Sequence, residues 1–258
     1  MSTPPSVGPE SSGMISMPAS GASARPDKVA PWWHTILFIV LMAIYGLIEL
    51  RYPPSSAAHG GPHARLVLYG LTIAFEYVLL GYVWLLGLKL QGKKLREIIG
   101  GNWSKFDQVA IDIGFAFLFW MAAVMVLLIT QKLVGVHASS LENLKFIFPH
   151  NIQEGVLWVV LACSAGFCEE TVFRGYLQRQ FLAATGNRWF AVILQAVVFG
   201  WVHVYQSAKN AIVIAVYGAL FGILAVIRGN LRPGMIQHSC QDTLAGIAGA
   251  ILSKHKFI

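Results

Sequence analysis

Seven long apolar runs occupy most of this sequence, and each is close to the length that crosses a lipid bilayer. A membrane-spanning helix needs about 20 mainly apolar residues. Because backbone polar groups in lipid must be bonded within their own segment, such runs form helices. The sequence therefore predicts an all-α fold, a polytopic transmembrane helix bundle with about seven (seven to eight) spans. The runs are Trp33–Leu50, Leu66–Leu88, Val109–Thr130, Gly155–Ala184, Trp189–Tyr205, Ala211–Ile227 and Met235–Leu252.

The composition agrees with a membrane protein. Of the 258 residues, 56% are hydrophobic and only 12% are charged, whereas about a quarter of an average soluble domain is charged. Such a composition excludes a soluble globular enzyme, a disordered chain and a nucleic-acid binder. We interpret the formal net charge of +7 as cationic residues that flank the spans, so the expected partner is membrane lipid and not nucleic acid.

The chain divides into a short tail and one membrane domain. Residues 1–30 are rich in Ser, Pro and Gly and contain no apolar run, so we expect a disordered tail; residues 31–258 form the predicted transmembrane helical domain. Cytoplasmic loops of membrane proteins carry an excess of Lys and Arg. Most of the 19 cationic side chains fall in inner segments if the amino terminus lies inside. We therefore expect an integral multi-pass protein with its amino terminus inside, in the cell membrane if bacterial or in the endoplasmic reticulum if eukaryotic.

Ionisable side chains within the predicted spans are the candidates for function, since each costs at least ~2.5 kcal/mol to insert. Glu170 and Arg174 are four residues apart on one helix face, so we expect them to form an ion pair. Glu169 is then left without a local partner, and an unpaired buried carboxylate suits a general base. The alternative, that both carboxylates only pair with arginines, stays open. The full set is Glu76, Asp112, Glu169, Glu170, Arg174, His203, His238 and Asp242.

Counting residues along the helices brings His203 to the depth of Glu169. A turn is expected near Gly186–Asn187, and an antiparallel hairpin around it places both side chains about 25 Å from the turn. A water molecule can then lie between the carboxylate and the imidazole. Phe199 is four residues before His203, on the same helix face, and is expected to pack against its ring.

His238 and Asp242 share one face of the last predicted helix, and a carboxylate there can orient the imidazole by accepting its second ring proton. The same counting, taken from a turn at Arg232–Gly234, leaves His238 roughly 15 Å nearer the inner surface than His203. A helix tilt or break is needed to bring His238 to the other residues. Glu76, near the middle of its span, is expected to line a cavity edge or pack on the late helices. A protonated helix–helix hydrogen bond is an equally good account of Glu76.

Three motifs occur in order on the late helices. Glu169–Arg174 reads E-E-x-x-x-R, Phe199–His203 reads F-x-x-x-H, and His238–Asp242 reads H-x-x-x-D. Together they resemble the CAAX-processing and bacteriocin-processing family of intramembrane proteases, also called the Abi or type II CAAX prenyl endopeptidase-like family. The resemblance covers about residues 155–252, and we find no motif of the family in residues 1–150.

The resemblance implies an intramembrane endopeptidase that cleaves a membrane-associated peptide or lipidated protein, prenylated proteins included. It implies that Glu169 and His203 activate a water molecule, and that His238 and Asp242 stabilise the oxyanion or hold the site together. Glu170, Arg174 and Phe199 would support these groups. Asp242 stands where the prenyl proteases have Asn. A charged Asp is a poor oxyanion donor, so we expect it to orient His238.

The residues leave two questions open. Glu169, His203 and His238, with Asp242 beside them, can also ligate zinc, but the chain lacks H-E-x-x-H, and we favour a metal-free glutamate mechanism with no cofactor. Buried Glu and His side chains also occur in ion-coupled transporters, although this chain shows no internal repeat. A non-catalytic immunity or scaffold protein on the same fold is the third possibility.

Overall fold

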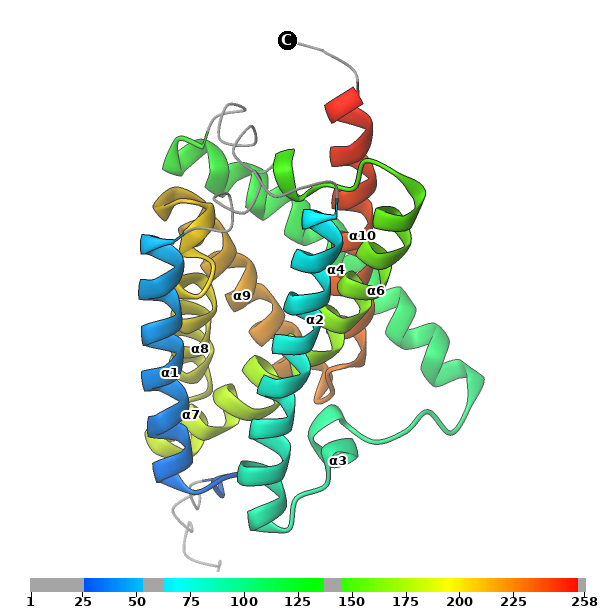
Figure 1. Cartoon of the computed structure of the whole chain (residues 1–258). Coiled ribbons are helices and arrows are strands. Elements are labelled where there is room, and N and C mark those ends of the chain that lie inside the picture. The colour runs from blue at the N-terminus through cyan, green and yellow to red at the C-terminus, as the bar shows by residue number, and fades with distance from the viewer. Residues whose placement is uncertain (1–25, 53–62, 137–144, 255–258) are drawn as a thin grey trace, which may run out of the picture.

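The computed structural model describes residues 26–52, 63–136 and 145–254, with the side chains of 252–254 left out of the description. These residues form helices joined by short connections, and no strand occurs among them (Figure 1). The predicted all-α fold is confirmed. The helical elements are α1 (Trp32–Arg51), α2 (Ala64–Gly81), the π-helix η2 (Tyr82–Leu88), η3 (Lys89–Gln91), α3 (Leu95–Ile99), α4 (Phe106–Val134), η4 (Lys145–Ile147), α6 (Ile152–Glu169), the π-helix η5 (Glu170–Leu177), α7 (Gln178–Thr185), α8 (Arg188–Trp201), η6 (Val204–Gln206), α9 (Ala208–Arg228) and α10 (Arg232–Lys254).

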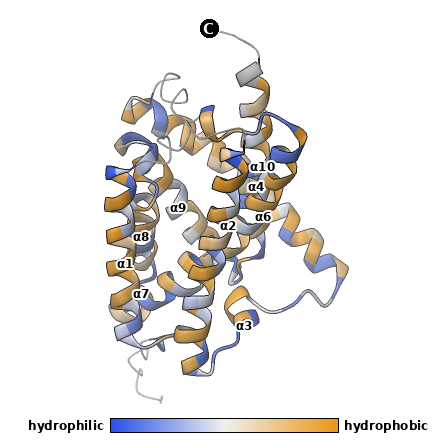
Figure 2. Ribbon diagram, viewed as in Figure 1, coloured by the Kyte–Doolittle hydropathy of each residue, from blue (hydrophilic) through white to orange (hydrophobic). Residues whose placement is uncertain are grey.

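Each of the seven predicted apolar runs is helical over most of its length. Within the described part of the chain, five helices are long and apolar enough to cross a membrane, and α8 is a shorter apolar helix. Figure 2 shows that the long helices are mainly apolar, and many of their large apolar side chains are exposed on the protein surface. Such a surface suits lipid, and the protein is an integral membrane protein. The long apolar helices are Trp32–Arg51, Ala64–Gln91, Phe106–Val134, Ile152–Thr185 and Ala208–Arg228.

The carboxyl-terminal helices pack into the centre of the bundle. α8 lies along α9, and α6 packs between α2 and α10. α1 covers α8, while α4 contacts α9 and α10. In Figure 1 the chain from α6 through η5 to α7 does not run straight: it changes direction on its way from the right to the lower left of the view.

Two helix boundaries, the end of α8 and the start of α10, differ from those expected from the sequence. α8 ends at Trp201 and not at Tyr205, because the chain turns back to start α9 at Ala208. A Cβ atom on Gly200 would lie 2.6 Å from the carbonyl oxygen of Ala211, so the two helices approach closely at this turn. The second boundary concerns the last helix. α10 already begins at Arg232, and the turn that we expected at 232–234 lies at 229–231.

The last residues of the expected amino-terminal tail lie against the bundle. Residues 1–25 lie outside the described residues, but Val29 and Ala30 are buried against the bundle. The Gln180 side chain accepts from the backbone N–H of Val29 at 2.7 Å and donates to the carbonyl oxygen of Ala30 at 3.0 Å. The chain is therefore fixed to α7 two residues before α1 begins.

Small residues allow α6 and α10 to pack with their backbones close together. A Cβ atom on Gly166 would lie 2.2 Å from Oγ of Ser239, and one on Gly234 would lie 3.2 Å from Oε2 of Glu170. Close approach through glycine is common where helices meet in a membrane. Here the close approach of α6 and α10 brings the first sequence motif, Glu169–Arg174, next to the third, His238–Asp242.

Candidate active site

Glu170 and Arg174 form the predicted ion pair. Nη1 of Arg174 lies 2.9 Å from Oε1 of Glu170, and both side chains are buried. Nη2 of Arg174 donates to the carbonyl oxygen of Gly218 on α9 at 3.2 Å. The guanidinium also lies over the rings of Phe199 and Phe221, at 4.3 and 4.9 Å from their centroids. The pair is thus enclosed by α8 and α9, and removal of either partner would leave a buried charge without compensation.

His238 binds to this pair. Its Nδ1 lies 3.1 Å from Oε1 of Glu170, and its ring stacks on Phe221 with the centroids 5.1 Å apart. The gap that we expected between His238 and the other motifs is therefore closed. It closes because α10 packs closely on α6 at Gly166 and because the α6–α7 segment is not straight.

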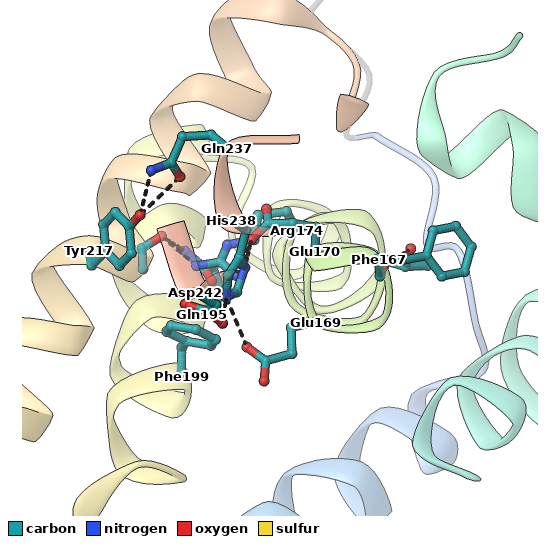
Figure 3. Close-up of polar contacts among 12 residues, drawn as sticks. Phe167, Glu169, Glu170, Arg174, Gln195, Phe199, Tyr217, Gln237, His238 and Asp242 are labelled. Atoms are coloured by element: carbon teal, nitrogen blue, oxygen red, sulfur yellow. Dashed lines mark hydrogen bonds and ion pairs between the residues drawn. The ribbon is translucent and has the colours of Figure 1, made fainter. Parts of the chain in front are cut away.

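Glu169 and Asp242 lie at the other nitrogen of the same imidazole (Figure 3). Nε2 of His238 is 3.5 Å from Oδ2 of Asp242 and 3.8 Å from Oε2 of Glu169. Oε2 of Glu169 is buried and has no hydrogen-bond partner. The Glu169 and Asp242 side chains retain 20% and 37% of their exposure, whereas that of His238 retains 6%. One edge of the imidazole is fixed inside the protein, and the other faces two partly accessible carboxylates.

His203 lies just beyond α8, in the turn to α9. Its Nδ1 is 2.8 Å from the carbonyl oxygen of Phe199. Since a carbonyl oxygen only accepts, Nδ1 carries the proton and Nε2 is left for another partner. The Phe199 ring packs against His203 as predicted, with centroids 4.8 Å apart, and it also lies 6.4 Å from the ring of His238. The Phe199 ring therefore contacts His203 of its own motif and lies near His238 of the third motif.

No hydrogen bond or ion pair joins the described side chains of Glu169 and His203. The expectation was for a water molecule between them, which does not require direct contact, so it stays a prediction. The carboxylate that the structure places within hydrogen-bond distance of an imidazole is that of Glu170, which contacts His238. Reasoning from the sequence assigned Glu170 only to Arg174.

The residues that we considered as zinc ligands do not form a ligand set. Among the residues that the structure describes, no three His, Cys, Asp or Glu side chains are grouped as a metal site requires. Nδ1 of His203 and Nδ1 of His238 are both directed to protein oxygens, which leaves the two Nε2 atoms as the ring nitrogens that could bind another group. The metal-free mechanism stays a prediction, and we derive no chemical step through a metal ion.

The two earlier buried carboxylates have protein partners. Glu76 on α2 accepts a hydrogen bond from Oγ of Ser164 on α6, so it packs on the late helices as predicted. Asp112 on α4 pairs with Arg228 at 3.0 Å and with Arg232 at 2.8 Å. Asp112 thereby joins α4 to the turn between α9 and α10, which is a structural role.

Several polar side chains near the site were not singled out from the sequence. Gln195 on α8 is fully buried, and its Nε2 donates to the carbonyl oxygen of Gly218 at 2.9 Å, the oxygen that Arg174 also contacts. Tyr217 and Gln237 are hydrogen-bonded to each other across α9 and α10. A search of the spans for amides as well as for ionisable groups would have found both glutamines.

One family model matches this chain. It is described as type II CAAX prenyl endopeptidase Rce1-like, and it covers residues 151–244. The match begins at the N-cap of α6 and ends two residues after Asp242, so it contains all three motifs. No match was found among curated proteins or among solved structures. Residues 151–244 are thus similar to the Rce1-like type II CAAX prenyl endopeptidase family.

Proposed function

We propose that this protein is an intramembrane endopeptidase in which Glu169 activates a water molecule to hydrolyse a peptide bond. One observation carries the proposal: two adjacent carboxylates flank a single imidazole in different states. Glu170 is buried, paired with Arg174 and bonded to Nδ1 of His238. Glu169 has a buried oxygen without a hydrogen-bond partner, 3.8 Å from Nε2 of the same ring. Glu170 therefore has a structural role, as the partner of Arg174 and His238, and the carboxylate of Glu169 is available to act as a base.

The reaction follows from this division. Glu169 takes a proton from water, and the water oxygen attacks the carbonyl carbon of the substrate. The carbonyl oxygen becomes an oxyanion, which requires a hydrogen-bond donor. When the C–N bond breaks, the proton on Glu169 passes to the leaving amine, and the carboxylate is restored.

His238 supplies the donor in this scheme. A carboxylate accepts hydrogen bonds only, so Glu170 holds the proton on Nδ1. Two further carboxylates near Nε2, Glu169 and Asp242, favour the imidazolium form, in which Nε2–H can donate to the oxyanion. The orienting role that we expected of Asp242 falls mainly to Glu170. Asp242 then supports the charge on His238.

His203 completes the proposed site from the α8–α9 turn. Its Nδ1 proton is held by the Phe199 carbonyl, so Nε2 can bind the water or the substrate. We propose membrane-associated substrates, either peptides or lipidated proteins that include prenylated ones, because the matching family model is named for prenyl endopeptidases. We also propose that the amino terminus lies inside.

Cleavage of a defined peptide tests the proposal. The probe is a quenched fluorescent peptide that ends in a farnesylated cysteine followed by three residues, and it is compared with the same peptide without the lipid. Purified wild-type protein is expected to cleave at least one of them, and Glu169→Ala protein with an unchanged melting temperature is expected to cleave neither. Equal cleavage by both proteins would exclude Glu169 as the base. A transporter or a non-catalytic scaffold predicts no cleavage by either.

A further inference from the structure

The connection between α2 and α4 gathers positive charge at one end of the bundle. Five cationic side chains lie within residues 89–105, where Glu97 is the only acidic residue. No ion pair joins any of these five to a carboxylate in the described part of the chain, so their charges are available to an anion outside the protein. Four are exposed and one is partly buried, and we name them together the cationic surface: Lys89, Lys93, Lys94, Arg96 and Lys105.

Large apolar side chains are exposed beside the cationic surface. Leu90 keeps 58% of its exposure, Trp103 keeps 43% and Phe106 keeps 84%. The segment joins the apolar helices Ala64–Gln91 and Phe106–Val134, at the end of the bundle where α1 begins (Figure 1). Cationic and aromatic side chains that flank membrane spans in this way lie at the level of the lipid headgroups.

The cationic surface is attached to the elements that carry the candidate active site. A Cβ atom on Gly175 of η5 would lie 2.5 Å from Cγ2 of Ile98 on α3, so α3 packs tightly on η5. Nη2 of Arg179 donates to the carbonyl oxygen of Ile98 at 2.8 Å. The backbone N–H of Leu231, in the α9–α10 turn, donates to the carbonyl oxygen of Ile99 at 2.8 Å. The cations therefore project from a fixed backbone, and binding a partner costs less ordering than it would in a free loop.

We propose that the cationic surface binds the headgroups of anionic phospholipids. Clusters of roughly four to eight Lys and Arg side chains beside a membrane helix attract anionic lipid, and ammonium and guanidinium groups form charge-assisted hydrogen bonds with phosphate. With the amino terminus inside, as proposed, this surface faces the cytoplasmic leaflet, which carries the anionic lipid. Bound lipid would hold α3 on η5, the helix of Glu170 and Arg174, and would stabilise the folded bundle. This role does not depend on the proposed proteolytic function.

Lipid binding to the full-length protein in detergent tests the proposal. The probes are phosphatidylglycerol and, as the neutral comparison, phosphatidylcholine, and mass spectrometry of the intact protein–lipid complexes measures their affinities. Wild-type protein is expected to prefer phosphatidylglycerol, and the double variant Lys94→Gln, Arg96→Gln is expected to bind it about tenfold more weakly. The matched control is Arg51→Gln, Lys132→Gln, which removes two exposed cations near the far ends of α1 and α4 and should bind as wild type does. Equal phosphatidylglycerol affinities of the two double variants, or no preference in the wild type, would overturn the proposal.

Thermal melting of the same proteins is the second measurement. Phosphatidylglycerol is expected to raise the wild-type melting temperature by several degrees more than phosphatidylcholine does, because a ligand of the folded state stabilises that state. The Lys94→Gln, Arg96→Gln protein should melt as wild type without lipid and lose most of this rise, whereas the control variant should keep it. If that variant does not fold, the single exchange Lys94→Gln replaces it and is expected to lose part of both the affinity and the rise. An equal rise in all folded variants would place the lipid elsewhere on the protein and exclude the cationic surface as its site.

Discussion

Glu170 and His238 lie 68 positions apart in the sequence, and their side chains meet at 3.1 Å in the interior of the bundle. The same Glu170 oxygen also accepts from Arg174 at 2.9 Å. One carboxylate oxygen therefore joins the first motif to the third. Since a carboxylate that receives two charged or polar donors is held in a fixed position, the orientation of the His238 ring depends on Arg174, which does not touch it.

The Arg174→Ala variant is expected to lose folded protein. Removing the guanidinium leaves Glu170 buried with His238 as its remaining partner, and breaking a buried ion pair costs about 3–5 kcal/mol. Thermal melting in detergent measures the loss. Arg188→Ala is the control, since Arg188 is exposed at the start of α8. Equal melting temperatures for Arg174→Ala and wild type would contradict the structural role of the pair.

The Glu76→Gln variant is expected to keep both stability and activity. Ser164 donates to one oxygen of Glu76, and a glutamine in the same place retains a carbonyl oxygen that can accept. Glu76→Leu removes the acceptor and leaves the buried Ser164 hydroxyl with only its weak contact to Sγ of Cys168 at 4.0 Å, at a cost of about 1–3 kcal/mol. Melting curves and peptide cleavage on both variants check this. A large loss of turnover in folded Glu76→Gln protein would instead give the Glu76 charge a part in the reaction.

The helices, and the contacts between site residues of the same motif, could be predicted from the local sequence pattern alone. Apolar runs of bilayer length gave the all-α membrane bundle, and the spacing of four residues gave the Glu170–Arg174 pair and the packing of Phe199 on His203. These inferences succeed because a helix fixes which neighbours three or four residues apart can touch. They need no knowledge of how the helices are arranged.

The contact between Glu170 and His238 could not be predicted in this way. Counting residues from a turn assumes straight helices that run parallel to each other and turns that lie where Gly and Pro occur. In the structure the α6–α7 segment changes direction, and α10 starts at Arg232, earlier than the expected turn allows. Gly166 and Gly234 let α6 and α10 approach each other closely. The sequence does not indicate which residues these glycines contact.

A chelator is expected to leave the activity of the purified protein unchanged. The described His, Cys, Asp and Glu side chains form no ligand group, and the proposed mechanism requires only Glu169 as the base. The measurement is peptide cleavage before and after treatment with EDTA and with 1,10-phenanthroline, followed by addition of zinc. Loss of activity that zinc restores, together with one zinc per protein that disappears in His203→Ala, would replace the metal-free mechanism by a zinc mechanism.

The His238→Ala and Asp242→Asn variants are expected to differ strongly in turnover, although both change groups at the same nitrogen. His238 would donate Nε2–H to the oxyanion, and loss of one such donor is expected to lower kcat by about 10²–10³-fold. Asp242 is partly exposed and lies 3.5 Å from Nε2. Asn is the residue that the prenyl proteases have there, so its substitution should reduce kcat less than about tenfold, the loss expected when one nearby charge is removed. The comparison requires kcat and KM on the quenched peptide for both variants, with melting temperatures to exclude unfolding. A loss in Asp242→Asn as large as that in His238→Ala would show that the Asp242 charge, and not the hydrogen bond from Glu170, keeps His238 in its active form.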